Sequence, residues 1–313
     1  MLFKTQSETY MQEIQTRRRN PVRESTARIY QSYLDARILP ELGQMDVSLV
    51  ENGVVKAFIV NLNASELAPA TINAVFKVVK AVVASAVDRN GNELYPQKWN
   101  HDFIDLPTVN KADQNTPTLA CKKLATALHK ASGQYQALFA LLAASGLRVG
   151  EALALQDNPG DAQNSPNSYW DAQTGILHIQ TILVNGAVQP VPKTQAGIRQ
   201  VDLAPEVNDY LRQAGLPLTG FLFRNSRGGP VRINTAYQQL ADVGITEGFH
   251  AFRRFRTTHL DAQNVPLGLA MYWIGHEQEG VHGSYIKIGR DLQTRKEWAV
   301  KAGFGFQLPR EAK

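Results

Sequence analysis

Helical spacing of apolar residues in this 313-residue chain is interrupted by one alternating stretch, and that pattern constrains the fold more than any other feature. Before residue 107 the apolar residues recur every three or four positions, and the stretches that show this are 26–43, 47–62 and 68–91. Such spacing is typical of amphipathic helices. We therefore expect residues 1–107 to form a small helical bundle without strands, in which Pro40 and Gly43 close the first helix.

A linker is expected after this bundle. Residues 104–120 contain two prolines and many polar residues, and they show no periodicity. This composition is typical of a connection over the surface, so we place the linker at 108–116 and a second domain at 117–313.

The second domain is expected to combine helices with a small sheet. Helical spacing returns at 121–130 and at 134–155, and a polar loop is expected over 156–175. Residues 176–203 alternate between apolar and polar and are rich in Ile and Val, which predicts a three-stranded antiparallel meander. Helices are expected again from Pro205, so the predicted fold class is mainly α with a small antiparallel sheet.

Charge and cysteine content narrow the cellular setting. Of 33 basic and 28 acidic residues, 12 of each lie in 1–107, which leaves 21 basic against 16 acidic in the rest. An excess of positive charge in one domain is compatible with a nucleic-acid backbone as partner. The single cysteine, Cys121, can form no internal disulfide and is expected to be a small buried residue. Because no signal or membrane segment is evident, we expect a cytoplasmic protein, which a nucleic-acid partner would make nucleoid-associated.

Four separated stretches hold the residues that could carry chemistry. Residues 145–153, "SGLRVGEAL", place Arg148 at a helix start with Glu151 three residues later, which alone would be an ordinary salt bridge. Residues 190–203 place Lys193 close to a strand turn, where alone it would be a solvated lysine. Residues 250–260, "HAFRRFRTTHL", put His250 and Arg253 on one helix face, and 273–285 add His276 and Tyr285.

The order of these residues, Arg, Lys, His-x-x-Arg, Gly-His and Tyr, resembles that of the tyrosine recombinases, the phage-integrase family. The resemblance covers nearly the whole chain. It implies that 1–107 form a helical, SAM-like core-binding domain and that 117–313 form an α+β catalytic domain, which together close around duplex DNA. One departure is His282, since the family often has threonine three residues before its tyrosine.

The resemblance also implies a role for each site residue. Tyr285 would attack a DNA phosphate and form a covalent 3′-phosphotyrosyl link, while Lys193 would protonate the departing 5′-oxygen. Arg148 and Arg253 would clamp the phosphate, with Glu151 orienting Arg148. His250 would assist loss of the tyrosine proton, and His276 would donate a hydrogen bond to a phosphate oxygen.

Neither a metal nor another cofactor is implied by the resemblance. The implied partners are double-stranded DNA carrying an att-like or inverted-repeat site, further copies in a homotetramer, and accessory bending or directionality factors. On the same helix, Arg254 and Arg256 are expected either to contact DNA or to stay solvated, and His259 is expected to be structural. The tail after Asp291 is expected to dock on a neighbouring protomer, with packing on its own domain as the alternative. The alternatives are a type IB topoisomerase and a DNA-binding regulator that keeps the fold without catalysis.

Overall fold

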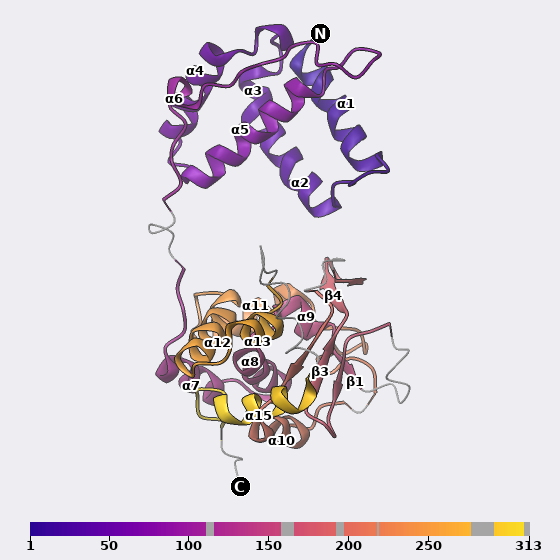
Figure 1. The fold of residues 1–313 in the computed structure, drawn as a ribbon, viewed down its shortest axis with the longest axis vertical. Helices are drawn as coiled ribbons and strands as arrows, with labels where there is room; N and C mark the ends of the chain where they lie inside the picture. The colour runs from indigo at the N-terminus through magenta and orange to yellow at the C-terminus, as the bar shows by residue number, and fades with distance from the viewer. Residues whose placement is uncertain (111–115, 158–165, 192–196, 218, 277–290, 310–313) are drawn as a thin grey trace. The chain divides into compact units, whose positions relative to one another are not determined.

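The computed structural model of the chain describes residues 1–110, 116–157, 166–191, 197–217, 219–276 and 291–309. The chain divides into two compact units, Met1–Gln114 and Asn115–Lys313 (Figure 1). The division falls inside the segment 108–116 that composition marks as a linker. Each unit has a hydrophobic core of its own.

The regular secondary structure among the described residues of the amino-terminal unit is helical. Its helices are α1 (Phe3–Thr16), α2 (Glu24–Tyr33), the π-helical turn η1 (Leu34–Ile38), α3 (Leu39–Leu42), the short 3₁₀ turn η2 (Val47–Leu49), α4 (Asn52–Ala64), α5 (Pro69–Ala84) and α6 (His101–Ile104). Among the described residues of this unit there are two isolated β-bridges, Leu2–Asp46 and Val87–Glu93, and no extended strand. The expected bundle is therefore confirmed, and α1 is an addition to it.

The first predicted helix is interrupted in a way that the sequence explains. α2, η1 and α3 follow one another without a break, and the run ends at Gly43 as expected. Pro40 was expected to close the helix, but it lies inside α3. Proline lacks an N–H and its ring collides with a carbonyl one turn earlier in a regular helix, and the π-helical turn lies just before it.

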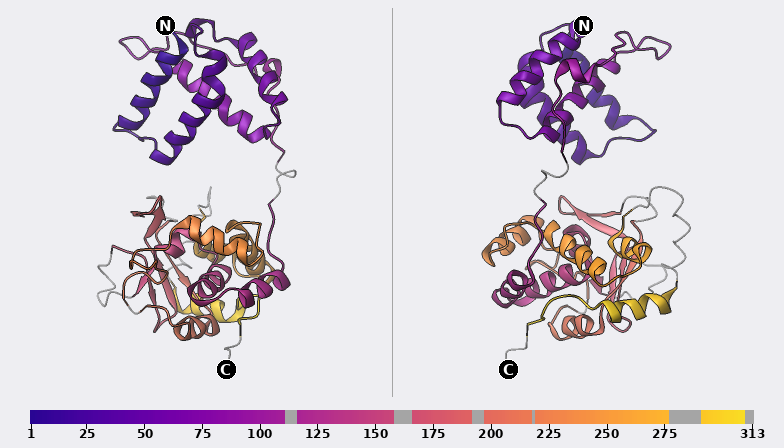
Figure 2. Two further views of the ribbon diagram at one scale, coloured as in Figure 1. Left: turned by 180° about the vertical axis from the view of Figure 1, so that it is seen from behind. Right: turned by 60° about the vertical axis from the view of Figure 1, so that its left-hand side comes forward.

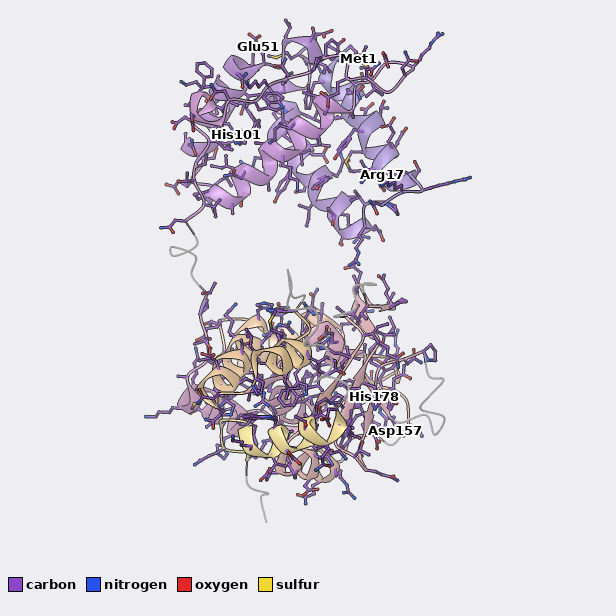
Figure 3. The ribbon with its side chains drawn as sticks, viewed as in Figure 1. Met1, Arg17, Glu51, His101, Asp157 and His178 are labelled. Carbon is purple, nitrogen blue, oxygen red and sulfur yellow. The ribbon has the colours of Figure 1, made fainter. Side chains whose placement is uncertain are left out.

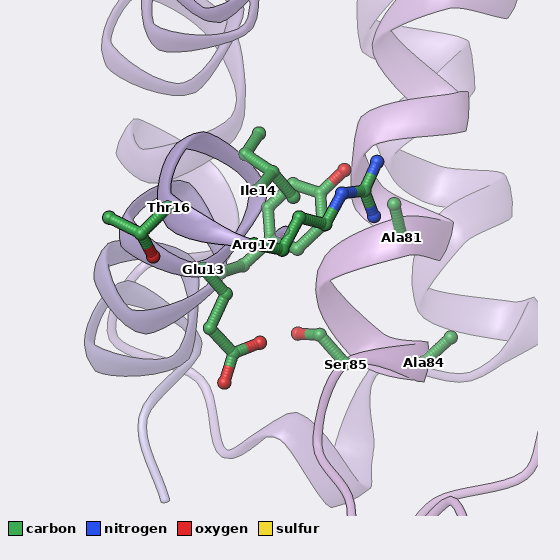
Figure 4. A pocket seen from close by; sticks show the side chains of 8 residues that line it. Glu13, Ile14, Thr16, Arg17, Ala81, Ala84 and Ser85 are labelled. Atoms are coloured by element: carbon green, nitrogen blue, oxygen red, sulfur yellow. The ribbon is translucent and has the colours of Figure 1, made fainter. Parts of the chain in front are cut away.

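The core of this unit is built from large apolar side chains on several helices. Phe3 of α1, Phe58 of α4 and Phe76 of α5 are each at most 1% exposed. Near the end of α1 a hollow of about 500 Å³ remains between α1 and α5, and its lining residues include Tyr10, Arg17 and Ala81 (Figure 4).

The second unit is organised around one buried helix. Its helices are α7 (Cys121–Lys130), α8 (Gly133–Ser145), α9 (Val149–Leu153), α10 (Pro205–Gln213), α11 (Ile233–Asp242), α12 (His250–Ala262), α13 (Leu267–Ile274) and α15 (Leu292–Ala302). Every residue of α8 from Ala137 to Ser145 is buried. Helices α7, α9, α10 and α12 pack against it (Figure 2).

The strands of this unit form two small sheets. They are β1 (Gln156–Asp157), β2 (Tyr169–Asp171), β3 (Ile176–Ile179), β4 (Thr181–Val184), β5 (Ala187–Pro190) and β6 (Arg199–Asp202). One sheet has the order β1-β2-β3-β6, and the other is the β4-β5 hairpin. β1 and β2 pair in parallel, whereas β2, β3 and β6 pair antiparallel.

The fold class is thus mainly α with a small sheet, as expected, but two details of the prediction were wrong. The sheet is mixed rather than purely antiparallel, because β1 pairs with β2 in parallel, and both strands lie within the expected polar loop. The meander is also wrong, since β6 returns to pair with β3 and leaves β4-β5 as a separate hairpin. Both strands of the parallel pair are only two or three residues long, too short to show a period.

The carboxy-terminal helix packs on its own domain, which is the alternative expected for the tail after Asp291. Arg295, Ala299 and Ala302 of α15 are buried, and Phe304, Phe306 and Leu308 pack against the same core. The expectation for Cys121 was wrong, because it is exposed at the first position of α7. Among the described residues, no helix is both long and apolar enough to cross a membrane.

Candidate active site

The first part of the site is the junction between α8 and α9. Gly146 ends α8 in the left-handed region with φ of 70°, where a Cβ would lie 2.6 Å from Ile274 Cδ1. Arg148 is the residue before α9, as the sequence predicted. Glu151 reaches back to it: Oε2 accepts from the Arg148 backbone N–H at 3.0 Å, and Oε1 accepts from Arg148 Nη1 at 2.9 Å. This arrangement holds the half-exposed Arg148 side chain at the start of the helix.

Glu151 also binds a second arginine, which the sequence analysis missed. Arg199 Nη2 donates to Oε2 at 2.8 Å and Nη1 donates to Oε1 at 3.2 Å. The side chains of Arg199 and Glu151 are 1% and 2% exposed. Burial opposes ionisation of Glu151, but the charge and hydrogen bonds of Arg199, together with those of Arg148, hold its pKa below the usual value. The signal in the sequence was an arginine within an apolar, alternating strand.

Helix α12 supplies the second part of the site. Phe252 and Phe255 are buried and anchor the helix, as expected. His250 stands exposed at the first helical position, and Arg253 lies one turn later with 3% of its surface exposed. Arg253 Nη1 donates to the carbonyl of Gly146 at 3.0 Å. Its other terminal nitrogen, Nη2, is buried without a hydrogen-bond partner, and in the described part of the chain it is the one buried side-chain nitrogen or oxygen in that condition.

The third part is the end of α13. Gly275 ends this helix with φ of 72°, and a Cβ on it would lie 2.8 Å from Arg199 Cζ. Both the backbone conformation and the space therefore require glycine here. His276 follows directly and is exposed.

Charge interactions tie these three parts together. Although His276 is exposed, neighbouring side chains remove part of the water around its ring and so lower its pKa, and the charges of Arg253, Arg148, His250 and Arg199 lower it further. Partial burial likewise lowers the pKa of His250, with Arg253, Arg254 and Arg148 adding to the shift. Burial lowers the pKa of Arg253 to about 10, which leaves it protonated at neutral pH. Arg148, His250, Arg253 and His276 therefore share one strongly positive region.

Two of the sequence-predicted residues, Lys193 and Tyr285, lie outside the described residues, as does His282. Before Lys193, the described residues end at the buried Val191, and they resume at Gly197 before β6. Before His282 and Tyr285, the described residues end at His276, and they resume at Asp291. Their roles stay predictions.

The remaining arginines of α12 differ from one another. Arg256 was expected to contact DNA or to stay solvated, and both options are wrong: it is 3% exposed and Nη1 donates to the Gly303 carbonyl at 2.6 Å. Arg254 is half-buried and Nε donates to the Pro117 carbonyl. His259 is structural, as expected, because Nε2 bonds to the Ala302 carbonyl at 2.8 Å.

The amino-terminal unit contains a cluster of arginines that the balanced charge count over residues 1–107 does not reveal. Arg17, Arg18, Arg19 and Arg23 are all exposed, in or beside the connection between α1 and α2. Arg17, labelled in Figure 3, lies directly after the end of α1. The net charge of the whole domain is zero because acidic residues elsewhere in it balance this local positive surface.

No group of three His, Cys, Asp or Glu side chains that could hold a metal ion occurs among the residues that the structure describes. The site is instead an array of guanidinium and imidazole groups around one buried carboxylate. Such an array binds and polarises an anion with planar, permanently charged donors. An array of this chemistry suits a phosphate or a similar anion as ligand.

Comparison with known proteins gives the fold a name. No family model and no curated protein sequence matches the chain. The integrase of transposon Tn1549, solved with transposon right end DNA, is 18% identical with a TM-score of 0.65, over 89% of this chain and 92% of that one. A lambda integrase tetramer bound to a Holliday junction is 15% identical with a TM-score of 0.62, over 90% and 79%. A lambda integrase dimer bound to a core site gives 14% and 0.61, over 89% and 96%. These neighbours are tyrosine recombinases, and the chain has their fold.

Proposed function

We propose that the chain is a site-specific DNA recombinase that cuts and rejoins DNA through a covalent 3′-phosphotyrosyl intermediate. The observation that carries the proposal is the buried, unpartnered Nη2 of Arg253 beside Arg148. A buried donor without a partner destabilises a fold by about 1–3 kcal/mol, so a ligand that accepts from it is expected. A phosphate oxygen is such an acceptor, and Arg148, held by Glu151, supplies the second guanidinium.

The proposed reaction uses the residues in the following way. The Tyr285 oxygen attacks phosphorus, the bond to the 5′-oxygen breaks, and the tyrosine proton leaves through His250. The lowered pKa of His250 keeps its imidazole neutral at pH 7, as a base must be. Lys193 gives a proton to the departing oxygen. Arg148, Arg253 and His276 stabilise the charge on the phosphate, and an aligned donor of this kind is commonly worth about 3 kcal/mol or more.

The partners follow from the same proposal. Solved neighbours carry transposon DNA, core-site DNA and a Holliday junction, and one of them is a tetramer. We infer that this chain binds paired sites in double-stranded DNA, in which case four copies would exchange the strands. The exposed arginines of 17–23 would contact the DNA backbone from the amino-terminal unit.

The test is a search for the covalent adduct. Nicked duplexes tiled across the DNA that borders the gene are incubated with the full chain and examined after denaturation. We expect one duplex to yield a denaturant-resistant adduct that disappears in Tyr285→Phe. Tyr272→Phe is the matched control, because the Tyr272 hydroxyl accepts from the backbone N–H of Gln200 and has no part in the proposed reaction.

Three results would contradict the proposal in different ways. An adduct that persists in Tyr285→Phe would place the nucleophile elsewhere. Specific binding without an adduct on any duplex would make the chain a DNA-binding regulator. Relaxation of supercoiled plasmids that lack the site would identify a topoisomerase instead.

A further inference from the structure

Arg199 makes more contacts than any other arginine of the site. Besides its two bonds to Glu151, Nε donates to the Trp273 carbonyl at 2.9 Å and Nη1 donates to the Gly197 carbonyl at 3.3 Å. All three guanidinium nitrogens are therefore engaged. With 1% of its side chain exposed, Arg199 cannot reach DNA.

These contacts join three segments that are far apart in the sequence. Glu151 belongs to α9, Trp273 to the last turn of α13, and Gly197 to the residues just before β6. Gly275 lies against the guanidinium, and His276 follows it. Arg199 thus connects the segment of Arg148, the segment of His276 and the strand that follows Lys193.

The charges at Glu151 explain why a second arginine is needed. Glu151 is buried, and the groups that face it among the described residues are Arg148 at the start of its own helix, Arg199 from β6 and Arg253 from α12. Paired with Arg148 alone, the carboxylate would cancel the charge that has to bind phosphate. With Arg199 present, the group of three keeps a net positive charge and the carboxylate stays ionised after burial.

We propose that Arg199 is a positioning residue for DNA cleavage, which keeps Glu151 ionised inside the domain so that Glu151 can hold Arg148 against the phosphate. This inference rests on the proposed function. If Arg199 only stabilised the fold, its substitution would also slow cleavage, but the size of that effect would not depend on the ionisation of Glu151.

The charge and the contacts can be separated with two variants. Arg199→Lys keeps the positive charge but cannot make all four bonds, whereas Arg199→Gln loses the charge. Without that charge, burial raises the pKa of Glu151, and its protonation releases Arg148 as the pH falls. The rate of adduct formation in a single turnover is measured from pH 8 to pH 5 for both variants.

We expect the Lys-to-Gln ratio of rates to grow at least about tenfold between pH 8 and pH 5, which corresponds to a pKa difference of about one unit. The titration of His250 cancels in this ratio, because Arg199 is not among the charges that lower its pKa. The pKa of His276 does depend on Arg199, so the ratio is measured again with Glu151→Gln in both variants, where only the contribution of His276 remains. A constant ratio, with both variants folded by circular dichroism, would overturn the proposal and leave Arg199 a structural residue. Absence of an adduct in the wild-type chain would instead overturn the proposed function.

A double variant keeps the test valid if Arg199→Gln does not fold. Arg199→Gln combined with Glu151→Gln replaces the buried ion pair with two neutral amides, which removes the uncompensated charge. If Arg199 acts through the charge of Glu151, the double variant should cleave at least as fast as Glu151→Gln alone. A further loss of about tenfold or more in the double variant would mean an independent structural role.

Discussion

The ion pair between Asp202 and Arg295 offers a direct test of how the carboxy-terminal helix docks. Arg295 of α15 donates to Asp202 of β6 through Nε at 2.8 Å and through Nη2 at 3.0 Å. Trp273 Nε1 donates to the same carboxylate at 2.7 Å. Both charged side chains are 3% exposed, so removing either partner leaves the other charge in a poorly solvated place.

The expected effect of Arg295→Met follows from this geometry. Loss of one member of a buried ion pair destabilises a protein by about 3–5 kcal/mol. Two charge-assisted hydrogen bonds at about 1.5–3 kcal/mol each give a similar figure. For a unit of this size, 1 kcal/mol shifts Tm by roughly 2–4 °C, so Tm should fall by about 6–20 °C.

The measurement is thermal and urea unfolding of the full chain, following the transition that belongs to residues 115–309. Arg212→Met is the matched control, because Arg212 pairs with Asp209 at 3.9 Å while 59% of its side chain is exposed. An exposed pair of this kind contributes less than about 1 kcal/mol. If Arg295→Met lost no more stability than Arg212→Met, the helix would not be docked through this pair, and docking on a neighbouring protomer would again be the better explanation.

Three further predictions concern the site and the DNA surface. Gly275→Ala should lose about 1–3 kcal/mol more stability than Gly220→Ala in urea unfolding, because both have φ near 72–75° but a Cβ meets a guanidinium at 2.8 Å only in the first case; equal losses would contradict the packing. The rate of cleavage by the wild-type chain should fall at low pH with a midpoint below 6.5, the ordinary pKa of histidine, because partial burial and neighbouring cations lower the pKa of His250 and favour its neutral form; a midpoint above 6.5 would contradict this. Changing the four arginines of 17–23 to Gln should weaken DNA binding and reduce the slope of log affinity against log salt by about 0.9 per lost phosphate contact, while Arg89→Gln, also exposed in this unit, should leave the slope unchanged.

The helices were the most predictable part of the fold, because their apolar periods are long. α7, α8, α9 and α12 lie where the sequence places them, and the turn at Ser145–Gly146 is the break that glycine predicts. Strands of two to four residues are too short to show such a period. β3 also pairs with β6, which follows it in the sequence only after the β4-β5 hairpin, and a local pattern does not predict that pairing.

The contacts of the site were predictable where they follow from spacing along one helix. They were not predictable where they depend on which side chains become buried together in the folded domain. The reach of Glu151 back to Arg148 follows from helical spacing and is confirmed. Arg199 was missed because its partners lie 48 and 74 residues away in the chain. The exposure of Cys121 likewise depends on which face of α7 meets the core, and one cysteine in an amphipathic helix does not settle that.

Two arginines of α12 show what distinguishes a structural buried cation from one that awaits a ligand. Arg253 and Arg256 are equally buried, and burial lowers the pKa of each to about 10. Arg256 donates to the Gly303 carbonyl, just after the end of α15, where the negative end of the helix dipole favours a cation. Arg253 donates to Gly146 through Nη1 and keeps Nη2 unpartnered. Since an unpaired buried donor is destabilising, the free nitrogen rather than the position in the sequence marks Arg253 as the arginine available to the proposed phosphate.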